Sequence, residues 1–133
     1  MRFLSIYKTA ETNEPPTPEH VANMLELIDE AVKAGWLIST EGCLPSALGA
    51  RVRRSGAQVS VTDGPFTEAK ELVGGFAILE AESREHAIEL TRKFLAVAGD
   101  GECELRQLYE APAVGPEDAT SHAAQLERQF AQS

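Results

Sequence analysis

Two stripes of apolar residues at helical spacing, each lying between strand-like segments, limit this chain to a small set of folds. The first stripe begins after Thr17 and Pro18, a good N-cap and first helical residue, and ends at Gly35. Its members are Val21, Met24, Leu25, Ile28 and Val32. The second stripe begins after Ser83 and consists of Ala87, Leu90, Phe94 and Ala98. Each predicted helix has one apolar face, which suits it to cover one side of a sheet.

The strand-like segments set the order of the fold. Residues 2–8, 36–38, 76–79 and 103–109 predict four strands, and residues 50–53 and 58–62, on either side of Ser55-Gly56, predict a hairpin. A short helical turn is expected at residues 67–71, and a kink or bulge at Gly74-Gly75, where the next strand starts. The order amounts to two βαβ halves with an inserted hairpin. Such halves interleave into one antiparallel sheet with both helices on one face, so we expect an α+β, ferredoxin-like fold.

One face of this sheet has no helix to cover it. In the first strand Leu4 and Ile6 lie on one side, and Phe3, Ser5 and Tyr7 lie on the other. We expect Phe3 and Tyr7, together with Phe76, to lie on the uncovered face. A second copy of the chain is the expected cover, which predicts a homodimer with two sheets packed face to face.

Charge limits the partners of the chain. Twelve Lys and Arg against 21 Asp and Glu give a net charge of −9, which repels nucleic-acid phosphates unless the bases gather on one surface. Arg51, Arg53 and Arg54 are such a group, but no aromatic residues are interleaved with them. We therefore do not expect direct nucleic-acid binding.

Length and cysteine content predict a single cytoplasmic unit. The 133 residues suffice for one core, which we place at residues 1–110, followed by a C-terminal tail at 111–133 in which Ala119 to Ala131 can form a weakly amphipathic helix. No apolar stretch reaches the roughly 20 residues that a membrane helix needs. The two cysteines, Cys43 and Cys103, are expected to be reduced thiols in the cytoplasm.

The segment Asp63-Gly64-Pro65-Phe66 is the most distinctive turn of the chain. Gly64 permits a backbone conformation that other residues avoid, and Pro65 fixes the next φ, so that together they can aim the Asp63 carboxylate at a strand end. Two interpretations stay open. Asp63 is either a functional carboxylate or a turn former that accepts backbone N–H bonds within its own turn.

Histidines and short motifs add one further candidate. His20 occupies the third position of the first helix, where the helix N-terminus disfavours a positively charged imidazole. It is therefore a candidate for a neutral histidine that forms hydrogen bonds or acts as a general base. The alternative is a half-exposed surface residue. His20, His86 and His122 are too far apart for a metal motif, and no Cys pair has metal-ligand spacing. Nucleotide-binding glycine motifs and a GxSxG elbow are absent from the sequence. We expect no metal and no cofactor.

Residues 62–71, TDGPFTEAKE, carry a family resemblance. Together with the surrounding stretch from Gly35 to Leu90 and the closing GECELRQLYEA, they resemble the DGPF branch of the YCII-related family over residues 1 to about 110. The resemblance implies the dimeric α+β barrel version of the ferredoxin-like fold. In the wider family a histidine and an aspartate hint at an enzyme, and His20 matches that histidine by its place early in the first helix. Some DGPF relatives are joined to sigma-factor domains, which hints at transcription control.

Two functions of different class follow from these residues. In the first, a pocket between sheet and helices, lined by Tyr7, His20, Asp63, Phe66 and Arg53, binds a small polar molecule and performs acid–base chemistry with Asp63 and His20. Lys70 and Glu71 of the motif are further candidates for ligand binding. In the second, the dimer is a non-catalytic regulatory or protein-interaction module linked to transcription.

Overall fold

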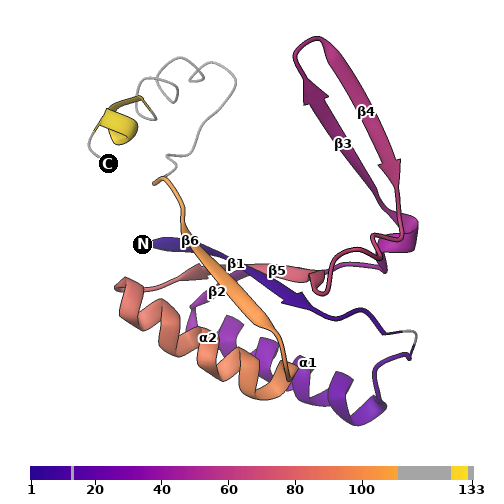
Figure 1. Ribbon diagram of the computed structural model, residues 1–133. Coiled ribbons are helices and arrows are strands. Elements are labelled where there is room, and N and C mark those ends of the chain that lie inside the picture. Colours follow the sequence, from indigo (N-terminus) through magenta and orange to yellow (C-terminus); the bar gives the residue numbers. More distant parts are fainter. Residues whose placement is uncertain (13, 111–126, 132–133) are drawn as a thin grey trace.

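The computed structural model describes residues 1–12, 14–110 and 127–131 (Figure 1). Along the chain the elements are β1 (Arg2–Thr9), α1 (Pro18–Ala34), β2 (Leu37–Gly42), the 3-10 helix η1 (Ser46–Leu48), β3 (Ala50–Ser55), β4 (Gln58–Asp63), β5 (Leu72–Glu80), α2 (Arg84–Ala98) and β6 (Glu102–Gln107).

Four strands form one antiparallel sheet in the order β2-β5-β1-β6, and β3 pairs with β4 in a separate hairpin. Both helices lie on the same face of the sheet (Figure 1). The expected α+β, ferredoxin-like fold is therefore confirmed, including the inserted hairpin.

The register of β1 decides which side chains meet the helices. Phe3 pairs with Leu79, and both are buried in the core beside Ala87 and Leu90 of α2. Tyr7 lies on the same side, with its ring 5.2 Å from that of Phe94 in an edge-to-face contact. The prediction that Phe3 and Tyr7 lie on the uncovered face is wrong. Alternation separates the two faces of a strand but does not say which one a helix will cover.

The uncovered face of the sheet carries the other set of β1 side chains. Leu4 pairs with Ile78, and Ile6 pairs with Phe76, which is 36% exposed. Strand alternation places all four on the face away from the helices, as expected for Phe76. We call Leu4, Ile6, Phe76 and Ile78 the open face.

Helix α1 begins and ends where the sequence predicts. Thr17 Oγ accepts the His20 N–H at 3.1 Å, and Gly35 adopts a left-handed conformation with φ of 84°. Its buried side is rotated relative to the predicted stripe, because Val21, Leu25 and Val32 are exposed. The fully buried residue is Ala31, whose small side chain allows the helix to approach the sheet closely.

The segment between hairpin and sheet differs from its prediction. In place of the short helical turn expected at residues 67–71, a non-helical turn at residues 66–69 is closed by the Ala69 N–H, which donates to the Phe66 carbonyl. Strand β5 begins at Leu72, earlier than expected, and the predicted bulge lies inside it. Tyr7 pairs with Gly75 and Lys8 pairs with Val73, which leaves Gly74 as the extra residue.

In the tail, residues 127–131 are helical, whereas the remainder of the helix expected at Ala119 to Ala131, and His122, lie outside the described residues. In the part of the chain that the structure describes, no helix has both the length and the apolar character needed to cross a membrane.

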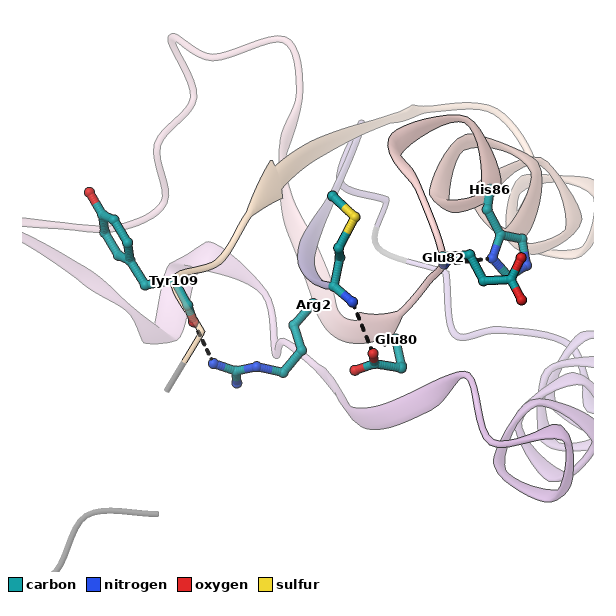
Figure 2. Close-up of polar contacts among 6 residues, drawn as sticks. Arg2, Glu80, Glu82, His86 and Tyr109 are labelled. Carbon is teal, nitrogen blue, oxygen red and sulfur yellow. Dashed lines mark hydrogen bonds and ion pairs between the residues drawn. The ribbon is translucent and has the colours of Figure 1, made fainter. Parts of the chain in front are cut away.

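The start of α2 is closed by a reciprocal pair of hydrogen bonds, which Figure 2 shows in part. Ser83 Oγ accepts the His86 N–H, and His86 Nδ1 accepts the Glu82 N–H, each at 3.0 Å. The pair is similar to a capping box, but the third helical residue is a histidine, and the N–H that it binds belongs to the residue before the N-cap. Figure 2 also shows the N-terminal amino group beside Glu80 and Arg2 donating to the Tyr109 carbonyl.

The cap predicts how His86 responds to substitution. His86→Ala should lower the free energy of unfolding by about 0.5–1 kcal/mol, because the Glu82 N–H loses its acceptor. His86→Gln should retain most of the stability, since its side-chain carbonyl oxygen can still accept a backbone N–H at the start of the helix. Urea denaturation measures both, and equal losses in the two variants would contradict the reciprocal cap.

Candidate functional site

A cavity of about 340 Å³ lies between the sheet and the two helices. Its volume falls within the range of small-molecule pockets. Much of its wall is large and apolar and comes from α1, β2 with its preceding residue, and α2: Met24, Leu27, Ile28, Trp36, Leu37 and Phe94. The space arises where small residues, Ala31, Gly74, Gly75 and Ala77, stand in the wall.

Two of the predicted site residues, Tyr7 and His20, line this cavity. The Tyr7 hydroxyl donates to the Asp100 carbonyl at 2.9 Å, and its ring is held by Phe94, so its position is well determined. His20 is half-buried, and its imidazole has no hydrogen-bond partner among the described residues. The cavity therefore contains an ionisable side chain whose polar atoms are not used by the protein.

A comparison of the two helix starts explains why the His20 imidazole is unused. His20 and His86 occupy the same third helical position after a hydroxyl N-cap, Thr17 in α1 and Ser83 in α2. In α2 the N–H that binds the imidazole comes from Glu82, the residue before the cap. The corresponding residue in α1 is Pro16, which has no N–H. His20 therefore cannot make the bond that His86 makes to Glu82, and its imidazole remains available to the cavity.

Asp63 lies elsewhere. It is the last residue of β4, at the base of the hairpin, and it is exposed. It does not line the cavity, and its carboxylate accepts no hydrogen bond from any residue that the structure describes. The structure thus brings Tyr7 and His20 together and places Asp63 apart from them.

Phe66 contributes to a second, smaller hollow of about 220 Å³ at the base of the hairpin. The Arg51 guanidinium lies over the Phe66 ring, 3.9 Å from its centre, and pairs with Glu68. The hydrogen bond from Arg51 holds the pKa of the Glu68 carboxyl below its usual value. Arg53, Lys70 and Glu71 are exposed and line neither hollow.

The Asp-Gly-Pro-Phe turn is anchored by residues that the sequence analysis missed. Glu11 accepts the Ser46 N–H at 2.6 Å and the Ser46 hydroxyl at 2.8 Å, and Ser46 Oγ accepts the Phe66 N–H at 3.2 Å. Gly64 donates its N–H to the Gly49 carbonyl, and the Gly64-Pro65 peptide is cis. Glu11 and Ser46 are 35 positions apart and carry no local motif, so no sequence pattern indicated this contact.

Among the residues described, no group of three His, Cys, Asp or Glu side chains is arranged to hold a metal ion. Both cysteines are free, and burial raises the pKa of the Cys103 thiol, which disfavours its reactive thiolate.

The fold and the cavity define an α+β, ferredoxin-like protein with a hollow between its sheet and its helices. The family model of the YCII-related domain matches residues 1–111, and the chain belongs to this family. It is 33% identical over 78 residues to an uncharacterised protein of Rhizobium meliloti (strain 1021), a match that covers 58% of this chain and 63% of that protein. Among solved structures, CutA from Xylella fastidiosa aligns with 93% of this chain and 96% of its own, at 15% identity and a TM-score of 0.38.

The anchored turn predicts a strong effect at Gly64. A Cβ at this position would overlap the Ser46 carbonyl oxygen, so Gly64→Ala should lower the free energy of unfolding by about 1–3 kcal/mol. Gly42→Ala is the matched control, because a Cβ there meets nothing within 4 Å, and it should change stability by less than about 0.5 kcal/mol. Chemical denaturation of both variants tests this, and a Gly64→Ala protein as stable as the control would contradict the close contact.

Proposed function

We propose that this protein binds a small molecule in the cavity between sheet and helices and uses His20 to exchange a proton with it. The observation that carries the proposal is the His20 imidazole, which lines the cavity and has no hydrogen-bond partner among the described residues. A neutral imidazole has one donor and one acceptor nitrogen, and it can accept or donate a proton near neutral pH. The Tyr7 hydroxyl, which donates to Asp100, retains the capacity to accept a hydrogen bond from a ligand.

The lining of the cavity restricts the ligand. The wall is largely apolar, which favours a ligand with an apolar body and a small polar group. None of the described residues that line it is Lys or Arg, whereas the exposed Glu41 stands among them. A buried anion without a cationic partner is costly, so the proposed ligand is neutral or cationic.

The remaining predictions, on the motif, on Asp63 and on the location of the protein, lie outside the proposed proton exchange. The motif at residues 62–71 supports assignment to the DGPF branch of the family. Asp63 lies outside the cavity, so proton exchange there does not involve it, and Asp63→Asn becomes a control. We retain the cytoplasm, with reduced thiols, as the proposed location.

Three probes with the same ring test the proposal: benzyl alcohol, benzylamine and benzoate. Benzyl alcohol and benzylamine should raise the Tm of the protein more than benzoate does, because no Lys or Arg stands among the described residues that line the cavity. A probe at ten times its Kd adds about 1.4 kcal/mol of stability. Differential scanning calorimetry measures the shift.

The variants assign the effect to the cavity. His20→Asn should reduce the rise with benzyl alcohol, whereas Asp63→Asn should leave it unchanged. Equal rises in the wild-type protein and His20→Asn, or equal rises with all three probes, would contradict the proposal. If no probe or metabolite stabilises the protein, the non-catalytic regulatory module becomes the better hypothesis.

We also propose that the chain forms a homodimer through the open face. Leu4, Ile6, Phe76 and Ile78 form a contiguous apolar row on two paired strands, and such a row on a sheet calls for a cover. Light scattering should give twice the 14.4 kDa of the chain. A mass of 14.4 kDa at every accessible concentration would contradict this.

A further inference from the structure

The β3–β4 hairpin, which we call the arm, is exposed along its whole length. Its register places Val52 opposite Val61 and Arg54 opposite Val59, so one side of the arm carries three valines and a single arginine. These valines are 69%, 63% and 62% exposed, respectively. A two-stranded hairpin is marginally stable alone in water, so an arm with a bare apolar side indicates a missing contact.

The base of the arm is held in a defined direction. Arg51 contacts both Phe66 and Glu68, and the Gly64 N–H donates to the Gly49 carbonyl across the base. From this base the arm projects away from the sheet on the side opposite the helices (Figure 1). This is the side of the open face. A molecule that covers the open face would lie beside the arm.

Charge indicates what that molecule is. Residues 50–63 carry three arginines and one aspartate, a net charge of +2, whereas the whole chain carries −9, which leaves −11 on the rest. Two copies of the chain, each with a net charge of −9, repel one another at long range, but each arm is opposite in charge to the remaining surface of the other copy. A second copy of this chain has the acidic surface that the arm requires, and by two-fold symmetry it offers a second arm in return.

We infer that the arm clasps a second copy of this chain, packing its valine side against the partner while Arg53 and Arg54 lie near the partner's acidic surface. The inference rests on the proposed homodimer and adds the element that holds it together. Because the arm is exposed in the single chain, changes in its valines should affect association and leave the fold of each subunit intact.

The test compares dimer dissociation constants by sedimentation equilibrium. Val52→Thr combined with Val61→Thr keeps side-chain shape and strand preference but removes apolar surface, four residues per dimer. We expect the Kd to rise by about a hundredfold. Thr62→Val, on the opposite side of the arm, is the control and should leave the Kd unchanged. Far-UV circular dichroism and thermal melting, at a protein concentration low enough for the chain to be monomeric, verify that the variants fold.

The outcomes separate the arm from the dimer. If the wild-type protein is a monomer, the homodimer and the arm both fail. If the wild-type protein is a dimer and the valine variant has the same Kd, the arm fails and the homodimer stands.

Discussion

The fixed alternation of β1 between two faces is the constraint on which the rest of the structure depends. β1 pairs with both β5 and β6, so its side chains decide what each face of the sheet contains. Phe3 and Tyr7 turn toward the helices, and Leu4 and Ile6 turn away from them. A slip of one residue would exchange the two sets and expose the core. The register thus determines both the helix-side cavity and the apolar face proposed for a partner.

The helix-side layer combines close packing with a hollow. At one end Phe3, Leu79 and Leu90 are almost fully buried, and they make a small core. Farther along β1, where Tyr7 pairs with Gly75, small residues of the sheet and of α1 leave the cavity open. Stability and the proposed binding function therefore come from different parts of the same layer.

Local patterns in the sequence predicted the helix caps and the hairpin well. Thr17, Ser83 and Gly35 act where they were expected, because capping depends on a few neighbouring residues. The faces of β1 were assigned wrongly, since that choice depends on helix packing across the whole sheet. The contact of Glu11 with Ser46 was missed because it joins two loops far apart in the chain.

The site was only partly predictable. His20, which lines the cavity, is a candidate because of its place in the helix, and Pro16 before the cap indicates that its imidazole lacks the N–H that His86 binds. Asp63 stood out because its turn is unusual. That turn instead packs Gly64 against Ser46 and directs the arm, while the Asp63 carboxylate remains exposed.

A crystal structure of the protein soaked with benzyl alcohol tests the central claim most directly. The account predicts the benzyl ring in the cavity between sheet and helices, with its hydroxyl within hydrogen-bond distance of the His20 imidazole. A cavity filled by its own side chains, with the alcohol bound elsewhere or absent, would contradict it.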